Sequence, residues 1–225
     1  TGWDVHMNHC DAIVTPCHFC KEIFVDAGVT TPIYVVPLGI NAIYRPVERN
    51  PERPLTFLAF IDRGLRKGGI EAQRAFQAAF GDNMNYRLIL KGRKSKIRAS
   101  ILNPNVELIQ EDYSEEQLYQ LYLRADVMIA ATKGEGFGLL PRQFAATGGI
   151  ALATNWAGTA DDIDRWGVPL DYKLVKADWS HHGRLATMDL GQWAEVDFDG
   201  LVAQLRHVAD HRETYARRAM AQAPG

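Results

Sequence analysis

Residues 126–149, with the sequence DVMIAATKGEGFGLLPRQFAATGG, decide how this chain folds. An apolar run is followed by a glycine-rich loop and by a helix that is predicted to begin near Leu139. Gly136 and Gly138 allow a sharp turn, so that successive N–H groups point at whatever lies above the helix N-terminus. Glu135 beside them can accept hydrogen bonds from sugar hydroxyls. The pattern indicates a site for a phosphorylated sugar, and the alternatives are a simple anion site or a plain strand–helix turn.

Strands and helices alternate through the surrounding sequence. Apolar runs predict strands over residues 55–61, 86–90, 106–109, 126–131 and 150–154, and amphipathic patterns predict helices over residues 69–80, 115–124 and 139–147. Such alternation requires right-handed crossovers and a parallel sheet that is covered on both faces. The predicted fold class is therefore α/β, a doubly wound parallel sheet. Ligands of such sheets bind beyond the carboxyl ends of the strands, where residues 132–138 are expected to lie.

The two ends of the chain have other patterns. A strand over residues 11–16, a helix over 17–27 that ends at Gly28, and a strand over 33–37 precede a proline-bearing linker at 45–54. Residues 171–199 have a less regular pattern, rich in aromatic residues and histidine, including His181 and His182, and are predicted to form a long ordered excursion. Residues 201–221 have an amphipathic pattern that fits one helix or two.

Composition excludes several classes of protein. With 225 residues, 47% hydrophobic residues and a formal net charge of −2, the chain is typical of globular proteins and gives no signal for binding nucleic acid. No apolar run approaches the roughly 20 residues that span a membrane, so a cytoplasmic protein is expected. Cysteines occur only at positions 10, 17 and 20, where packed thiols are favoured over a zinc site that would include His9.

The glycine-rich segment resembles a family signature. Its order of acidic residue, Gly-Phe-Gly, apolar residues and small-residue helix is similar to the Glu–seven residues–Glu motif of the retaining group 1 glycosyltransferases, which have the GT-B fold. The resemblance implies that Glu135 contacts a sugar hydroxyl. Gln143 stands where the family has a Glu that binds the ribose diol, and its neutral amide oxygen accepts such hydrogen bonds less strongly. The substrate-binding loop implied by the resemblance comprises Gly136, Phe137, Gly138 and Leu139.

The resemblance also implies a division of the chain. The segments Asp11-Ala-Ile-Val-Thr-Pro16 and Val35-Val-Pro-Leu-Gly-Ile40 resemble the last strand and helix of the family's N-terminal domain and the crossing that follows them. Residues 1–45 are therefore expected to be the tail of that acceptor domain and the interdomain crossing. Residues 46–225 are expected to be the Rossmann-like, nucleotide-sugar donor-binding domain. Complete family members are considerably longer, so the acceptor site is expected to lie outside this chain.

A basic turn follows the first strand of the larger part. Arg63-Gly-Leu-Arg66-Lys67-Gly68 combines cations and glycines at a predicted helix N-terminus, which suits a diphosphate; the alternative is a solvated basic turn. The family uses an Arg and a Lys-Gly pair here to bind the donor pyrophosphate. Lys67-Gly68 matches that pair, and either Arg63 or Arg66 takes the role of the Arg. By this resemblance Glu135, Lys67 and Arg63 are the candidate catalytic residues, and Arg66 is a candidate substrate-binding residue.

Further candidates lie at the ends of other strands. Lys91 either reaches a phosphate or the base, or faces solvent as an ordinary surface lysine. Ile109 lies where the family binds the nucleotide base through backbone groups, with Tyr113 as a stacking ring or a plain surface aromatic. Residues 155–159 resemble a family turn that lies near the donor sugar.

The resemblance implies transfer of a sugar from a nucleoside diphosphate sugar to an acceptor hydroxyl, with retention at the anomeric carbon. The expected acceptor is a glycan or a lipid-linked sugar, as in polysaccharide biosynthesis, and a peripheral membrane contact through the rest of the N-terminal domain is left open. No metal or other cofactor is expected, because basic residues are available for the diphosphate and Asp197-Phe-Asp199 precedes a helix that it can cap. The alternatives are a nucleotide-sugar-binding module without turnover and a Rossmann-type oxidoreductase, whose Gly-x-Gly-x-x-Gly sequence is missing here.

Overall fold

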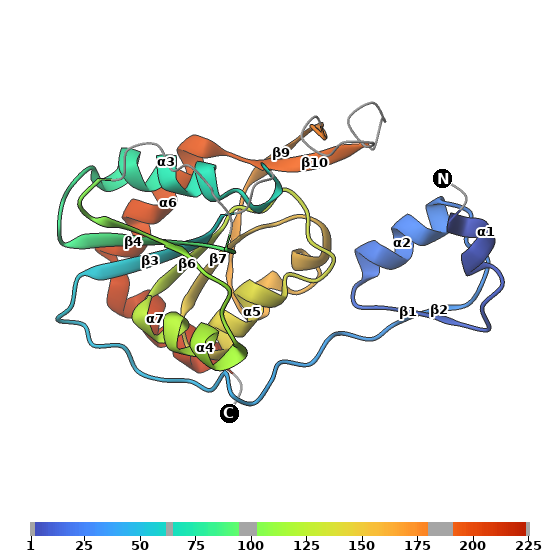
Figure 1. The fold of residues 1–225 in the computed structure, drawn as a ribbon, viewed down its shortest axis with the longest axis horizontal. Helices are drawn as coiled ribbons and strands as arrows, with labels where there is room; N and C mark the ends of the chain where they lie inside the picture. Colours follow the sequence, from blue (N-terminus) through green and yellow to red (C-terminus); the bar gives the residue numbers. More distant parts are fainter. Residues whose placement is uncertain (1–2, 62–64, 95–102, 180–190, 224–225) are drawn as a thin grey trace.

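A six-stranded parallel sheet lies at the centre of the computed structural model, which describes residues 3–61, 65–94, 103–179 and 191–223 (Figure 1). The strand order is β5-β4-β3-β6-β7-β8. The chain therefore builds outwards from β3 on one side and then from β6 on the other, and the direction reverses between these two strands. The strands are β3 (Leu55–Phe60), β4 (Tyr86–Gly92), β5 (Val106–Gln110), β6 (Val127–Ala130), β7 (Ile150–Thr154) and β8 (Val168–Leu170).

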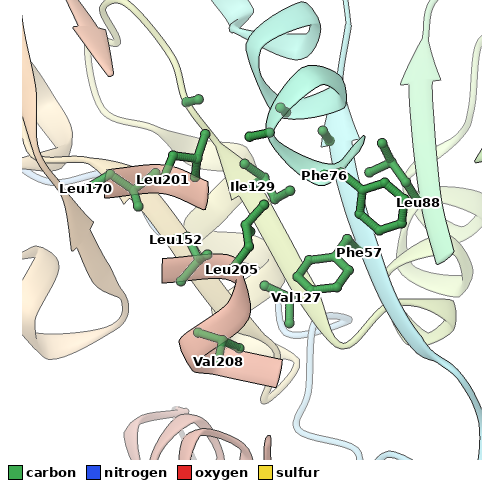
Figure 2. Close-up of a cluster of buried hydrophobic side chains, with 14 of the residues drawn as sticks. Phe57, Phe76, Leu88, Val127, Ile129, Leu152, Leu170, Leu201, Leu205 and Val208 are labelled. Atoms are coloured by element: carbon green, nitrogen blue, oxygen red, sulfur yellow. The ribbon is translucent and has the colours of Figure 1, made fainter. Parts of the chain in front are cut away.

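Helices cover both faces of this sheet. α3 (Gly69–Phe80) and α6 (Phe198–Asp210) cover one face, and α4 (Glu115–Arg124) and α5 (Leu139–Ala146) cover the other (Figure 1). Figure 2 shows Phe76 of α3 and Leu205 of α6 among the side chains of β3, β4 and β6. Because both faces are covered, β6 and β7 are buried along their whole length, which explains their continuous apolar runs. The predicted doubly wound α/β class is confirmed.

The C-terminal pattern corresponds to two helices rather than one. α6 is followed directly by α7 (Arg212–Gln222), with His211 between them. Asp197 is the N-cap of α6, and its carboxylate accepts a hydrogen bond from the N–H of Gly200 at 3.2 Å. The predicted capping role of this aspartate is therefore confirmed.

The ordered excursion expected over residues 171–199 contains two strands that the sequence did not predict. β9 (Tyr172–Lys176) and β10 (Gln192–Val196) form an antiparallel pair outside the main sheet. Within this pair, only β10 has buried side chains, among them Trp193 and Val196. The alternation of apolar and polar residues that predicts a strand is therefore weak in this segment. His181 and His182 lie outside the described residues.

Residues before the main sheet form a small unit of their own. It contains α1 (Trp3–Met7), β1 (Ile13–Thr15), α2 (His18–Asp26) and β2 (Ile33–Val35), and its two strands pair in parallel. Gly28 follows α2 with a φ of 91°, as predicted for a residue just beyond a helix C-terminus. A long connection then runs along the larger unit (Figure 1), and Tyr44 within it is buried beside Tyr119 and Tyr122.

Three short 3₁₀ helices complete the described elements: η1 (Leu65–Lys67), η2 (Ala157–Thr159) and η3 (Ile163–Arg165). Within the described part of the chain, no helix is both long enough and apolar enough to cross a membrane.

Candidate functional site

The candidate site lies where the strand order reverses. The carboxyl ends of β3 and β6 are neighbours in the sheet, with Leu58 opposite Met128. The basic turn follows β3 and the glycine-rich loop follows β6, so the two motifs meet although they are far apart in the sequence. In open α/β sheets this reversal is the usual position of a ligand. Gly68 is a point of close approach, because a Cβ atom there would lie 1.8 Å from the carbonyl oxygen of Ala131.

The carbonyl groups of the glycine-rich loop are bonded to the protein on one side. The carbonyl of Glu135 accepts a hydrogen bond from the N–H of Gly158 at 2.9 Å. The carbonyl of Gly136 accepts one from the thiol of Cys17 at 2.9 Å, and that of Phe137 accepts one from Nε of Arg142 at 2.9 Å. A trans peptide places each C=O opposite the N–H of the next residue. The N–H groups of residues 136–138 therefore point away from these partners.

Those N–H groups lie at the start of α5. Among the described residues, no acceptor is found for the N–H of Gly136, Phe137, Gly138 or Leu139. Gly138 is the N-cap of α5, has a φ of 75°, and provides no side-chain cap. A helix N-terminus with unpaired N–H groups carries partial positive charge and attracts anions. The loop therefore presents directed donors that the protein itself does not use.

The side chain of Glu135 lies between the two described basic residues of the turn. Its Oε1 atom is 2.7 Å from Nζ of Lys67 and 3.0 Å from Nη1 of Arg66. Arg66 also donates to the carbonyl of Gly134 at 2.7 Å. The structure thus brings Glu135, Lys67 and Arg66 together, with all three side chains partly exposed. Arg63, the other candidate for the Arg role, lies outside the described residues.

Two cavities form a groove along this edge of the sheet. The first, of about 100 Å³, is lined by Lys67, Glu135, Gly138 and Leu139 among others. The second, of about 600 Å³, extends towards Lys91, and the two share Phe60, Lys67 and Leu140. The remaining residues of the second cavity are Ile61, Arg66, Gly92, Arg93, Glu111, Asp112, Tyr113 and Leu118. The groove therefore passes from the glycine-rich loop to the ends of β4 and β5.

Lys91 is not a solvent-facing lysine, since it is only 5% exposed. Its Nζ atom donates to the carbonyl groups of Gly92 and Glu111 and lies 4.3 Å from the centre of the Tyr113 ring. Burial lowers the pKa of Lys91, although the charges of Asp112 and Glu111 oppose this shift. The ammonium group of Lys91 therefore lies in the wall of the larger cavity, with the Tyr113 ring beside it.

Ile109 and Gln143 offer no side chain to the groove. Ile109 is 9% exposed, packs in the core, and pairs with Lys91 in the sheet, which leaves backbone groups near the strand end for a ligand. Gln143 is 7% exposed, and its Oε1 atom lies 3.5 Å from the hydroxyl of Tyr122. Burial raises the pKa of Tyr122, so its hydroxyl stays protonated as a donor. Among the described residues, α5 lines the two cavities through residues 139–141 rather than Gln143.

The turn at residues 155–159 packs directly behind the glycine-rich loop. Ala157 in this turn has a φ of 61°, which is strained for a residue with a Cβ atom. A Cβ atom on Gly158 would lie 2.3 Å from the carbonyl oxygen of Gly136, so only glycine fits there. The side chain of Thr159 donates to the carbonyls of Thr154 and Trp156 at 2.6 and 2.8 Å. The turn supports the loop through backbone packing.

Sequence reasoning missed two buried cations around the loop. Arg142, on α5, is 8% exposed and bonds both the loop and the turn behind it. Lys133, which precedes the loop, is 5% exposed; its Nζ lies 3.0 Å from Oε1 of Glu71 and 5.1 Å from the centre of the Trp193 ring. Each of them also depends on partners outside the glycine-rich segment, Asp162 for Arg142 and Glu71 for Lys133, which no local motif marks. Lys133 thereby attaches the β9–β10 pair to the site.

The cysteines do not assemble a metal site in the described residues, where no group of three or more His, Cys, Asp or Glu side chains could hold a metal. Cys10 is exposed, Cys20 is half-buried, and only Cys17 is buried. The expectation of three packed thiols was thus wrong for Cys10. Burial raises the pKa of Cys20 to about 12, with a further contribution from its hydrogen bond with Cys17.

Comparisons with known proteins complete the description of the site. No protein-family model matches the chain, and a search of curated proteins finds no match. Among solved structures, a sucrose-phosphate synthase from Thermosynechococcus elongatus matches with a TM-score of 0.69 and 15% identity, over 98% of this chain and 55% of that one. A UDP-forming α,α-trehalose-phosphate synthase from Burkholderia xenovorans, in complex with glucose-6-phosphate, matches with a TM-score of 0.69 and 13% identity, over 97% and 58%.

A third match covers a domain rather than a full enzyme. It is the C-terminal domain of LpcC, a glycosyl transferase group 1 family protein from Francisella tularensis, with a TM-score of 0.58 and 14% identity, over 82% of this chain and 96% of that one. The chain spans little more than half the length of the two synthases. At these identities the likeness concerns the fold. The chain has the fold of GT-B group 1 glycosyltransferases, chiefly that of their C-terminal domain, as its glycine-rich segment predicted.

Proposed function

We propose that this chain binds a nucleoside diphosphate sugar and provides the donor half of a glycosyltransferase, which transfers the sugar to an acceptor hydroxyl with retention. The observation that carries this proposal is the set of unpaired N–H groups at the start of α5, beside Lys67 and Arg66 and at the reversal point of the sheet. Directed N–H donors and two cations suit a diphosphate. The fold that the chain shares with group 1 glycosyltransferases supports the same conclusion.

In this proposal the diphosphate takes the place that the Glu135 carboxylate now holds beside the cations. Lys67, with Arg66 or Arg63, neutralises the charge that develops on the departing diphosphate, and the loop N–H groups add directed donors. Glu135, released from Lys67, accepts hydrogen bonds from the sugar hydroxyls. The base then lies in the larger cavity between Tyr113 and the backbone at Ile109, above Lys91. Gln143 stays assigned to the ribose diol in this proposal, which requires its side chain to turn from Tyr122 towards the groove when the nucleotide binds.

The proposal also assigns different roles to the two parts of the chain. We assign residues 1–45 to the tail of an acceptor domain and the crossing, and residues 46–225 to donor binding. The structures it resembles are almost twice as long, so the acceptor, taken to be a glycan or lipid-linked sugar, would bind outside this chain. A reaction in the cytoplasm, with a peripheral membrane contact through the rest of the N-terminal domain, completes the assignment. The second candidate is a nucleotide-sugar-binding module without turnover of its own, which the same site serves equally well.

Calorimetric titration with UDP, GDP and ADP tests the proposal directly. We expect at least one of the three to bind with a Kd in the millimolar range or tighter, and to bind equally well with a chelator present. The absence of heat with all three nucleotides, or strict dependence on a divalent metal, would contradict it. Donor hydrolysis separates the two candidates: slow release of sugar favours the enzyme half, and tight binding without any release favours the binding module.

A further inference from the structure

Arg142 contacts both the glycine-rich loop and the turn behind it. Its guanidinium donates from Nε to the carbonyl of Phe137 at 2.9 Å and from Nη2 to the carbonyl of Gly158 at 3.0 Å. It also forms a two-pronged ion pair with Asp162, with distances of 2.8 Å from Nη1 and 2.6 Å from Nη2. The rings of Phe137 and Trp166 lie 4.1 and 4.8 Å from its central carbon. One buried cation thus joins the glycine-rich loop to the turn behind it.

The charge of Arg142 is already neutralised within the protein. Burial of Asp162 acts to raise its pKa, but hydrogen bonds from Arg142 and Trp166 and the charges of Arg142 and Arg165 outweigh burial and hold the pKa below its ordinary value. Asp162 is therefore ionised at neutral pH and opposite Arg142. Arg142 is 8% exposed and is not among the residues that line the groove on the Lys67 side. A bound diphosphate would not meet this guanidinium directly.

Arg142 contacts the loop through backbone groups. The carbonyl of Phe137 and the N–H of Gly138 belong to one rigid peptide group, so holding the carbonyl also orients the N–H. The carbonyl of Gly158 is held by the same guanidinium, while the N–H of Gly158 donates to the carbonyl of Glu135. A planar guanidinium can satisfy these acceptors together, and the single ammonium of lysine cannot.

We infer that Arg142 is a positioning residue: it fixes the peptide between Phe137 and Gly138 so that the N–H groups at the start of α5 point at the diphosphate of the donor. The inference rests on the proposed function. It assigns a role to a residue that lies outside the glycine and glutamate positions of the signature. Binding at this loop then depends on a buried side chain that the ligand does not touch.

A pair of matched variants tests the inference. R142K keeps the positive charge beside Asp162 but loses the planar donor set. Arg49 is the control, because it is a half-buried arginine that also bonds backbone carbonyls, those of Val47, Ala125 and Thr147, and lies 5.7 Å from the Phe144 ring, at the far end of α5. We expect R142K to weaken nucleoside diphosphate binding at least about tenfold, and R49K to leave the Kd within about twofold, at equal folded fraction. Equal Kd values for wild type and R142K would overturn the inference.

A second readout separates this inference from the proposed function. In ¹H–¹⁵N spectra without ligand, R142K is expected to shift the amide signals of Gly136 and Gly138, and R49K is expected to leave them in place. If wild type binds no nucleotide but R142K moves these signals, the proposed function fails and the anchoring of the loop stands. If the signals do not move, the anchoring fails whatever the wild type binds. Should R142K not fold, D162N, which removes the charge facing the guanidinium, is expected to shift the same two signals.

Discussion

The two edges of the central sheet carry similar clusters of charge that serve different purposes. At the amino edge, Oδ1 of Asp126 lies 2.9 Å from Arg53 and 3.4 Å from Arg212, and Oδ2 accepts from the N–H of Thr56 at 2.9 Å. At the carboxyl edge, Glu135 lies between Lys67 and Arg66 at comparable distances. Each cluster is one carboxylate with two cations. The difference lies in what surrounds it.

The amino-edge cations have further acceptors in the backbone. Arg212 donates to the carbonyls of Asn50, Pro51 and Arg53, and Arg53 donates to that of Arg124. A cavity of about 450 Å³ also lies at this edge, but helices α4 and α5 end here with carbonyl groups, which do not attract anions. At the carboxyl edge, α5 begins beside a groove with N–H groups that find no acceptor among the described residues. The ion pairs at the amino edge are therefore tied into the backbone, whereas those at the carboxyl edge lie beside a groove, where we propose that an anion replaces Glu135.

The largest expected effect comes from breaking the amino-edge cluster. Asp126→Ala leaves two arginines without their carboxylate, and we expect the free energy of unfolding to fall by about 2–4 kcal/mol, allowing for the partial exposure of both arginines. Denaturant unfolding measures this loss. The nucleotide Kd of the folded fraction is expected to stay unchanged. A loss below about 1 kcal/mol would mean that this cluster does not act as a clamp.

At the carboxyl edge, Lys67→Ala is expected to change nucleotide binding rather than stability. It removes a charge-assisted contact to the diphosphate, worth about 1.5–3 kcal/mol, so the Kd for the best nucleotide is expected to rise at least tenfold. The free energy of unfolding is expected to change by less than about 1 kcal/mol, because the Lys67–Glu135 pair is partly exposed.

Lys173→Ala is the matched control for that variant. The side chain of Lys173 is 72% exposed and pairs with Glu195 at 3.5 Å on the β9–β10 pair, away from the groove. The free energy of unfolding and the nucleotide Kd of Lys173→Ala are both expected to match those of wild type. If Lys67→Ala binds as well as Lys173→Ala, then Lys67 is an ordinary surface lysine.

Gln143→Glu tests whether residue 143 contacts the nucleotide at the carboxyl edge. If residue 143 contacts the ribose diol, a charged acceptor there is expected to tighten nucleotide binding by about 1 kcal/mol, the difference between neutral and charge-assisted hydrogen bonds. Calorimetry of both forms with the same nucleotide measures the change. Weaker binding by the variant would show that the side chain serves the core beside Tyr122 instead.

The smallest expected effect is the pH dependence of the Arg142–Asp162 pair. Because the pKa of Asp162 in the folded protein lies below the ordinary value of 3.8, the pair stabilises the fold above that value and loses its contribution as pH falls through the lowered pKa. Denaturant unfolding of wild type and D162N from neutral pH to about pH 3 should reveal the difference, which solvent screening keeps below about 1 kcal/mol. Acid destabilisation is expected to be shallower in D162N. Parallel curves would contradict the lowered pKa.

Several elements were predicted from the sequence with their bounds. The predicted helices over residues 69–80 and 115–124 and the predicted strand over 150–154 coincide with α3, α4 and β7. Their signals are local: an apolar period, and for α4 a capping box in which Ser114 and Gln117 bond each other's backbone N–H groups. The β9–β10 pair was missed because it is buried on only one strand. Strength of the local pattern decided which elements could be predicted.

The candidate site divides in the same way. Glycine positions and a basic turn are visible in a one-dimensional pattern, because each reflects the conformation or the charge of adjacent residues. The sequence by itself thus determined the alternating strands and helices, the glycine-rich loop proposed to bind an anion, and the cations that face it. It also indicated the fold family, through residues 135–143.

Contacts between distant residues were decided only by the tertiary structure. Lys67 and Glu135, 68 positions apart, meet because β3 lies beside β6 in the sheet, and no local pattern specifies that neighbourhood. The same holds for Lys91, which folding buries under Tyr113, and for Arg142, which folding places opposite Asp162. Burial and pairing of a charged side chain depend on every element packed around it. For that reason the sequence located the candidate binding loop, and the folded chain decided which buried cations contact it.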